Sequence, residues 1–215
     1  MKKGTLFVID GLDGSGKGTQ LDMLKERLPA RHPDRNFVFT REPGGSPYAE
    51  TIRDVILNKK EAGGASAKTM AHLFSAARSD HVEHLVLPAL EEGSVVVSDR
   101  FESSTFAFQL IAQNGGLEAR EIFELQRKHF RKLIPTWKTI VLDVPTEVAR
   151  ERAQVRATQE QTHFDERGIG FHRAVRSGFR EYATAFPEAC VAFVDATRSK
   201  EEVFDEVLAL IEGHL

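Results

Sequence analysis

Five short apolar runs, rich in β-branched residues, alternate along the chain with amphipathic stretches. The runs are Thr5–Ile9, Asn36–Thr40, Ser94–Ser98, Thr139–Val144 and Val191–Val194. Runs of this length and composition predict buried strands. Strands that are separated by helices are typically parallel and joined by right-handed crossovers. The pattern therefore predicts an α/β fold with a five-stranded parallel sheet flanked by helices.

The amphipathic stretches between these runs predict the helices. In the stretch from Ala67 to Glu92, side chains that would share one helix face recur at spacings of three and four residues: Met70, Leu73, Phe74, Ala77 and His81. We expect this helix to end at Gly93, and a second one, from about Leu117, to end before Pro135. The chain shows no repeat, linker or low-complexity tract, so we expect one domain over residues 1–215.

Composition excludes several classes of function. With 29 Lys and Arg against 32 Asp and Glu, the net charge is −3, which predicts no broad basic face and no nucleic-acid partner. The single cysteine, Cys190, stands beside an apolar run and is expected to be a buried small residue. One cysteine forms no internal disulfide, which is typical of a reducing compartment. The apolar run after Lys2 and Lys3 is too short for a signal peptide. We expect a cytoplasmic protein without a membrane partner.

A glycine-rich segment, GLDGSGKGT, follows the first strand and precedes a helix. Glycines allow successive backbone N–H groups to turn toward one centre, and a helix N-terminus adds partial positive charge, so the segment predicts a phosphate cradle. Lys17 would reach the outer phosphates of a nucleotide. The expected ATP contacts are Gly11, Gly14, Ser15, Gly16, Lys17, Gly18 and Thr19. The alternative is an ordinary glycine-rich turn between a strand and a helix.

The residue after the lysine departs from the strict P-loop pattern. Where a magnesium-binding Ser or Thr is usual, the chain has Gly18, and the hydroxyl follows at Thr19. Such a loop resembles those of nucleotide kinases of the adenylate kinase type. The resemblance implies the P-loop NTPase fold in its nucleoside monophosphate kinase-like form.

Polar residues follow four of the five predicted strands. They are Asp10, Arg41 with Glu42, Asp99 with Arg100, and Asp195 with Arg198. Ligands of open α/β sheets bind beyond the carboxyl ends of the strands. We therefore expect these side chains to line one site.

Two further segments resemble the thymidylate kinase family. The loop Arg41–Gly45 (REPGG) follows the second strand, and Leu73–His81 (LFSAARSDH) is similar to the family's LFxADRxxH segment, except that Ala77 replaces an acidic residue. The resemblance implies that Arg41 and Pro43 contact the acceptor nucleotide, while Phe74 stacks on a pyrimidine and Arg78 binds a base carbonyl. The alternative for Arg41 is an ion pair with Glu42 in a surface turn. Without the resemblance, Phe74 would be interpreted as a core aromatic.

The segment after the third strand extends the resemblance. Asp99-Arg100-Phe101 resembles the family's DRY/DRF/DRH motif, and Ser104–Gln109 its S(T/N)xA(Y/F)Q segment. The resemblance implies that Asp99 contacts Mg²⁺ through water, together with Thr19, and that Arg100 bridges the donor and acceptor phosphates. It also implies substrate contacts from Ser104, Thr105, Phe108 and Gln109, with Phe108 on the 2′ side of the sugar. The alternative is a buried structural pair of Asp99 and Arg100.

The resemblance also implies the remaining catalytic residues. Asp13 corresponds to an acidic residue near the acceptor sugar and the metal. Some members carry an arginine at the position of Gly14, and members without it supply catalytic arginines from a mobile lid. We expect that lid at about residues 147–165, with Arg156 and then Arg152 as the catalytic candidates. The alternative is a solvated basic helix. Arg198 is expected near the adenine of ATP.

Taken together, the motifs predict ATP-dependent phosphorylation of dTMP to dTDP, with Mg²⁺, by a homodimer of the family type. Two alternatives remain at this point. One is a kinase for another pyrimidine monophosphate, such as dUMP, UMP or CMP. The other is a non-catalytic P-loop protein that binds nucleotides and regulates a partner. The chain shows no NKxD-like guanine motif and has arginines at the expected phosphate positions, which favours the enzyme.

Overall fold

Five parallel strands form one sheet in the computed structural model of the chain, which describes residues 4–134, 137–156, 164 and 167–215, with the backbone alone at 155 and 156. The strands are β1 (Thr5–Gly11), β2 (Phe37–Arg41), β3 (Val95–Asp99), β4 (Trp137–Asp143) and β5 (Val191–Asp195). Their order is β2-β3-β1-β4-β5, and every neighbouring pair is parallel. The predicted sheet is confirmed, with strand boundaries that differ from the prediction by up to two residues.

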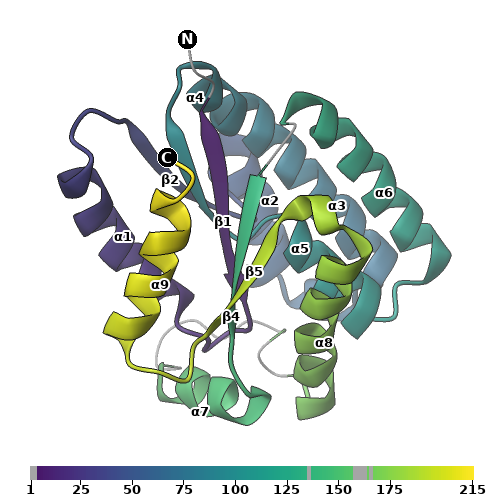
Figure 1. Cartoon of the computed structure of the whole chain (residues 1–215). Helices are drawn as coiled ribbons and strands as arrows, with labels where there is room; N and C mark the ends of the chain where they lie inside the picture. The colour runs from purple at the N-terminus through teal and green to yellow at the C-terminus, as the bar shows by residue number, and fades with distance from the viewer. Residues whose placement is uncertain (1–3, 135–136, 157–163, 165–166) are drawn as a thin grey trace.

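The register of the strands brings the predicted polar residues to one end of the sheet. Asp99 of β3 lies opposite Ile9 in β1 and Arg41 in β2. On the other side of β1, Asp143 of β4 pairs with Asp195 of β5. The carboxyl ends of all five strands therefore lie at the end of the sheet beside α7 in Figure 1.

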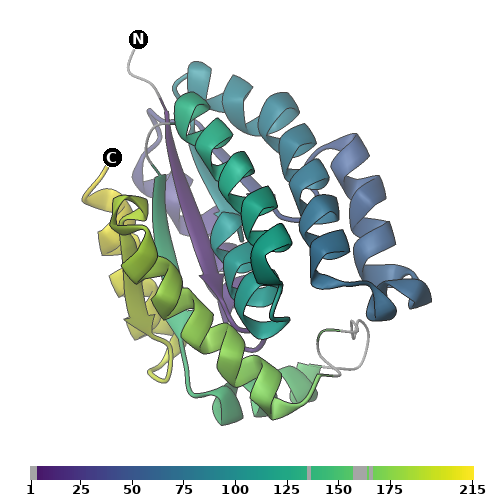
Figure 2. The same cartoon turned by 90° about the vertical axis from the view of Figure 1, so that its right-hand side faces the viewer.

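Helices cover both faces of the sheet. Those of eight or more residues are α1 (Lys17–Arg31), α2 (Pro47–Asn58), α3 (Ala67–His81), α6 (Gly116–Leu133), α7 (Thr146–Arg156), α8 (Ile169–Ala185) and α9 (Lys200–Glu212). The shorter segments are α4 (Leu87–Glu91), α5 (Glu102–Thr105), the 3₁₀ turns Lys60–Gly64 and Pro187–Ala189, and the π-helical segments Val82–Val86 and Phe106–Ala112. α1 and α9 pack together on one face (Figure 1), whereas α8, α6, α3 and α2 form a row on the other (Figure 2).

Successive apolar side chains of β1 enter two different core clusters. Phe7 and Ile9 belong to the larger one, which contains apolar side chains of α1 and α9 and extends to α2, α3 and α8. Leu6 and Val8 belong to a second cluster, with Phe130 of α6. Side chains alternate between the faces of a strand, so a strand with a continuous apolar run, as β1 has from Leu6 to Ile9, must be covered on both sides.

The helix expected from Ala67 to Glu92 is present, but it is widened in the middle. The π-helical turn Val82–Val86 joins α3 to α4, and the Leu87 N–H group bonds to the Val82 carbonyl five residues earlier. Pro88 follows directly; it has no N–H group, and its ring disfavours a regular α-helical turn before it. α6 ends at Leu133, as expected, although Pro135 itself lies outside the described residues.

The expectation for Cys190 is wrong, because its thiol is exposed. The residue has a left-handed backbone conformation, with φ 48° and ψ 54°, at the end of the turn Pro187–Ala189. The apolar run begins only at the next residue, where β5 starts at the edge of the sheet. Cys190 therefore belongs to the turn and not to the core. Among the helices that the structure describes, none has the length and apolar character needed to cross a membrane.

α8 packs very closely against the π-helical segment Phe106–Ala112, which carries Phe108 and Gln109. At Gly178 of α8, an added Cβ atom would lie 2.8 Å from the Cα atom of Ala107 and 3.1 Å from its Cβ atom. The glycine therefore sets the distance between α8 and a segment that lines the predicted substrate site.

Replacing Gly178 with alanine should destabilise the protein, although alanine is the better helix former. The added methyl group meets backbone atoms, so we expect a loss of about 1–3 kcal/mol in the free energy of unfolding, as for other overpacked cores. Gly170 on the same helix is the control, because a Cβ atom there meets nothing within 4 Å. In thermal unfolding, Gly178→Ala should lower Tm by roughly 2–4 °C per kcal/mol, whereas Gly170→Ala should leave Tm unchanged or slightly raised. Equal Tm values for the two variants would contradict the close-packing argument.

Candidate active site

The glycine-rich loop connects β1 to α1 and has the backbone of a phosphate cradle. Gly11, Gly14 and Gly16 have φ values of 136°, 82° and 99°, which L side chains rarely adopt. Gly16 is the N-cap of α1 and makes no side-chain cap, so the first N–H groups of the helix are available to an anion. The predicted strand, turn and helix are all present here.

Gly14 also has a packing role, because the loop lies against α7 at this position. An added Cβ atom would lie 1.9 Å from the Ala149 carbonyl oxygen and 3.1 Å from the Ala153 nitrogen. In this arrangement no side chain fits at position 14. The segment proposed as the start of the lid is therefore in direct contact with the phosphate loop.

Lys17 is folded back over the same loop. Its Nζ atom donates to the carbonyl oxygens of Leu12 (2.9 Å) and Gly11 (3.1 Å) and lies 3.7 Å from a carboxylate oxygen of Asp13. Burial lowers the pKa of Lys17, and the nearby Arg100 lowers it further. A phosphate in the cradle would give this buried ammonium group a stronger partner than two backbone carbonyls.

Arg100 connects the third strand to the loop. Its Nη2 atom donates to Asp13 Oδ1 at 2.5 Å, and its Nη1 atom lies within 3.3 Å of acceptors on Ser104, Gly11 and Asp10. Burial alone would lower the pKa of Arg100, but the carboxylates of Asp13 and Asp10 raise it above its ordinary value. Burial likewise opposes ionisation of Asp13, yet Arg100 and Lys17 hold the pKa of this carboxyl below its usual range.

Asp10, which is predicted to follow the first strand but has no predicted catalytic or binding role, organises this cluster. Its fully buried carboxylate accepts hydrogen bonds from Ser103 Oγ (2.6 Å), Ser104 Oγ (2.8 Å), the Gly11 N–H group (2.9 Å) and Arg100 (3.3 Å). Burial raises the pKa of Asp10 despite these donors. The position of Asp10 at the end of a predicted strand was the only feature of the sequence that pointed to this residue. No sequence pattern predicted its hydrogen bond from Ser103.

The REPGG loop is fixed to α2. Glu50 Oε1 accepts from the Gly45 N–H group, and its other oxygen accepts from Arg41 Nη2, both at 2.9 Å. Arg53 Nη1 donates to the Pro43 carbonyl at 2.8 Å. The ion pair of Arg41 is therefore with Glu50 and not with Glu42. About half of the Arg41 side chain is exposed at the carboxyl end of β2, where an anion can reach it.

Arg78 has the opposite environment, because its side chain is only 2% exposed. Its Nε atom donates to Glu42 Oε2 (2.7 Å), its Nη2 atom to Thr105 Oγ1 (2.9 Å) and its Nη1 atom to Gln126 Oε1 (3.0 Å). Of these partners, Thr105 is one of the predicted substrate-binding residues. Glu42 stood in the REPGG motif, and nothing in the sequence pointed to Gln126.

The rings of Phe74 and Phe108 both lie close to the ring of Phe164. The ring centroids are 6.5 Å apart for Phe74 and Phe164, and 5.8 Å apart for Phe108 and Phe164. The guanidinium group of Arg100 lies 5.3 Å from the Phe108 ring centroid. Gln109 is 1% exposed and donates to Gln113 at 3.4 Å. The aromatic residues of the predicted substrate side therefore form one cluster next to Arg100.

Asp99 and Thr19 are the residues expected to hold a metal ion. The Oδ1 atom of Asp99 is buried and has no hydrogen-bond partner, and the same is true of Ser15 Oγ in the phosphate loop. Within the described ranges, no three His, Cys, Asp or Glu side chains are grouped closely enough to bind a metal by themselves. Mg²⁺ usually keeps several waters and takes few protein ligands, so an unpartnered carboxylate oxygen beside a phosphate loop fits this ion.

The lid candidates lie on or beyond α7. Arg152 Nη1 donates to the Ala196 carbonyl, after β5, at 2.8 Å. Arg156 is the last residue of α7, and its side chain lies outside the described residues, as do 157–163 and 165–166 of the expected lid. Arg198 is exposed and forms an ion pair with Glu206.

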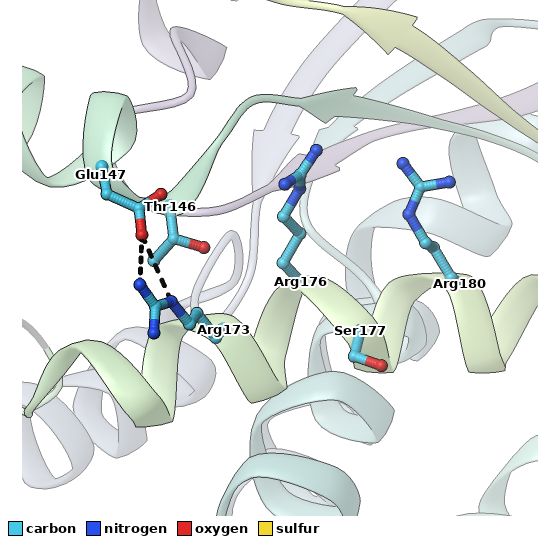
Figure 3. A pocket seen from close by; sticks show the side chains of 6 residues that line it. All are labelled: Thr146, Glu147, Arg173, Arg176, Ser177 and Arg180. Atoms are coloured by element: carbon cyan, nitrogen blue, oxygen red, sulfur yellow. Dashed lines mark hydrogen bonds and ion pairs between the residues drawn. The ribbon is translucent and has the colours of Figure 1, made fainter.

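A groove of about 430 Å³ runs between the start of α7 and α8 (Figure 3). Its lining residues are Thr146, Glu147, Arg173, Arg176, Ser177 and Arg180. Arg173 donates to Glu147 (Figure 3), while Arg176 and Arg180 donate to Asp143 at the end of β4. The hydrogen bond from Arg176 keeps the pKa of Asp143 below its usual range. These ion pairs hold α8 to the end of the sheet.

Comparison with known proteins agrees with this geometry. A sequence profile of thymidylate kinases matches residues 9–207. The chain is 41% identical to a thymidylate kinase of Symbiobacterium thermophilum over 203 residues, which cover 94% of this chain and 90% of the relative. It is 36% identical to one of Neisseria meningitidis, over 99% of this chain and 98% of that one. The crystal structure of thymidylate kinase from Ehrlichia chaffeensis superposes with a TM-score of 0.70 at 26% identity, covering 97% and 99% of the two chains. The chain therefore belongs to the thymidylate kinase family.

Proposed function

We propose that the chain transfers the γ-phosphoryl group of ATP to the 5′-phosphate of dTMP, giving dTDP and ADP. The observation that carries this proposal is the meeting of three positively charged side chains at adjacent strand ends. Lys17 begins α1 directly after the loop that follows β1, Arg41 ends β2, and Arg100 follows β3. Transfer between two nucleotides needs a donor site and an acceptor site side by side, with positive charge between them.

The donor side is the phosphate loop. Backbone N–H groups of residues 14–19 would bind the β- and γ-phosphates, with Lys17 leaving its carbonyl partners to reach the outer phosphate. Arg198 and the Ala196 carbonyl lie on the loop after β5, where we place the adenine.

Arg100 stands between the two phosphates. It is held at both ends, by Asp13 and by the pair of Asp10 and Ser104, so its charge is already oriented before the reaction. A preorganised cation costs no reorganisation when negative charge develops on the transferred group. We assign to Asp13 the orientation of Arg100 and a contact with the acceptor sugar.

The acceptor side combines phosphate and base recognition. We assign the acceptor phosphate to Arg41 beside Pro43, stacking on the base to Phe74, and a base carbonyl to Arg78. Contacts with the base edge and the sugar fall to Ser104, Thr105, Phe108 and Gln109. The aromatic cluster around Phe164 supplies the apolar wall that a thymine ring needs.

The site residues fit a magnesium ion that arrives with ATP. Asp99 would hold it through water and Thr19 through its hydroxyl, with the phosphate oxygens as further ligands. Mg²⁺ supplies neutralisation of phosphate charge and orientation of the donor phosphates.

The missing side chain at position 14 supports a lid that supplies the catalytic arginine. Since Ala149 of α7 occupies the space beside Gly14, the positive charge on this side must come from another element. We assign it to Arg156, with Arg152 next, on a mobile segment at about residues 147–165 within a single kinase domain.

We further propose a cytoplasmic homodimer. α2 and α6 lie in the outer row of helices (Figure 2) and carry large exposed apolar side chains, at Tyr48, Val55, Leu117, Leu125 and Leu133. A molar mass from light scattering near the 24.0 kDa of one chain would contradict the dimer.

The proposed activity predicts a clear acceptor preference. In a coupled assay of ADP release with ATP and Mg²⁺, dTMP should give a higher kcat/KM than dUMP, dCMP, UMP and AMP, and EDTA should abolish turnover. A preference for another pyrimidine monophosphate would favour the alternative kinase. Nucleotide binding without turnover of any acceptor would favour the regulatory alternative.

The lid assignment predicts different effects for the two arginines. Arg156→Ala should lower kcat by at least tenfold, about 1.4 kcal/mol, because it removes charge that acts in the transition state. Arg152→Ala should mainly raise the KM for ATP, since Arg152 contacts the loop after β5. Arg150→Ala on the same helix is the control, because its side chain is exposed. If neither Arg156→Ala nor Arg152→Ala lowers kcat tenfold, the lid assignment is wrong.

A further inference from the structure

The guanidinium group of Arg78 is held at all three of its nitrogen atoms, by three different elements. Glu42 comes from the loop after β2, Thr105 from α5 and Gln126 from α6. The face of the Phe101 ring lies 5.3 Å from the guanidinium carbon. Three in-plane contacts fix the plane of a guanidinium group and its rotation within that plane.

A count of donors shows what remains for a ligand. Arginine has five N–H groups, and the three hydrogen bonds use one on Nε and one on each terminal nitrogen. One N–H group on each terminal nitrogen is left. Both lie in the plane that the three partners define, so a movement of any partner would re-aim them.

Gln126 is oriented so that its oxygen faces Arg78. Its Nε2 atom donates to the Ser75 carbonyl at 2.6 Å, and its Oε1 atom accepts from Arg78 Nη1 at 3.0 Å. Since arginine only donates, the amide oxygen is the sole atom of Gln126 that can meet it. The ion pair of Arg78 with Glu42 does not involve Gln126, so Gln126 can be changed without leaving a buried charge unpaired.

We infer that Gln126 is a positioning residue for base selection, which acts through Arg78. This inference rests on the proposed function, in which Arg78 binds a base carbonyl. Thymine and uracil present a hydrogen-bond acceptor at C4, whereas cytosine presents an amino group there. A donor that is held in one orientation binds the first and rejects the second, because two donors then face each other. Without Gln126, the Nη1 side of the guanidinium group loses its anchor, and the contact with the 4-carbonyl weakens.

A thermodynamic cycle, in which Gln126 and the 4-oxygen of the substrate are removed separately and together, tests this inference. The kcat/KM of the wild-type protein and of Gln126→Met is measured with dTMP and with its analogue that lacks the 4-oxygen. We expect the kcat/KM of the wild-type protein to fall at least tenfold when the 4-oxygen is absent from the substrate. The kcat/KM of Gln126→Met should fall threefold or less. The selectivity for dTMP over dCMP should fall in parallel, with the KM for ATP unchanged. Glu121→Met, at an exposed position of the same helix, should retain the wild-type penalty.

The alternative is that Gln126 only joins α6 to α3 through Ser75. A lower Tm with an unchanged 4-carbonyl penalty in Gln126→Met would establish that alternative and overturn the inference. If the methionine variant does not fold, Gln126→Glu replaces it: this variant keeps an acceptor for Arg78 and loses the donor to Ser75, so it should retain the full penalty. If the wild-type protein phosphorylates dTMP and the analogue without the 4-oxygen with the same kcat/KM, the inference alone is overturned. If it does not phosphorylate dTMP at all, the proposed function is overturned as well.

Discussion

The buried carboxylate of Asp10 is the contact on which the geometry of the phosphate site depends. Asp10 is the last residue but one of β1, the central strand of the sheet. Its carboxylate accepts hydrogen bonds from the backbone N–H group of Gly11, from the two serines Ser103 and Ser104, and from Arg100. A carboxylate in this position is costly unless donors surround it, and burial does raise its pKa. The arginine and the serines offset that cost. Arg100 has a left-handed backbone conformation, with φ 70°, from which its guanidinium group also reaches Asp13.

A second buried carboxylate, that of Glu42, organises the contact between the REPGG loop and α3 in the same way. Glu42 places one oxygen against Arg78 and the other 3.0 Å from His81 Nδ1, while His81 Nε2 lies 2.8 Å from Thr40 Oγ1. The loop that carries Arg41 and the helix that carries Arg78 are therefore parts of one polar network. Removing one member of such a network leaves a buried group unsatisfied, which costs more than the bond itself contributes. This explains why the Arg78 side chain can be almost fully buried although it is charged.

The sequence was sufficient to predict the elements whose physics is local. Apolar runs predicted the strands. The glycines between β1 and α1 predicted a tight turn with positive φ angles, because glycine tolerates such angles at Gly14 and Gly16 without help from its neighbours. The π-helical turn before Pro88 was not predicted. The spacing of apolar residues describes a helix as a whole, whereas the proline changes the hydrogen bonding of a single turn. The prediction for Cys190 was wrong for a similar reason. Cys190 closes the turn Pro187–Ala189 and directly precedes β5, and a pattern that spans several residues does not resolve a boundary of one residue. Gln126 was missed as a partner of Arg78 because it lies 48 positions away along the chain, and no local sequence pattern predicts a contact of that range. Asp10 was visible as a strand-end residue, but its hydrogen bonds were not.

The contact between Gly14 and α7 links these local features to the whole site. A glycine in a phosphate loop is usually explained by its φ angle, and φ 82° at Gly14 requires that explanation here too. The 1.9 Å approach of the Ala149 carbonyl to a Cβ atom at this position adds a second constraint. The loop and α7 can lie this close only if position 14 carries no side chain, so the glycine also fixes how α7 packs against the loop. The same residue thus shapes the turn of the loop and the position of the neighbouring helix.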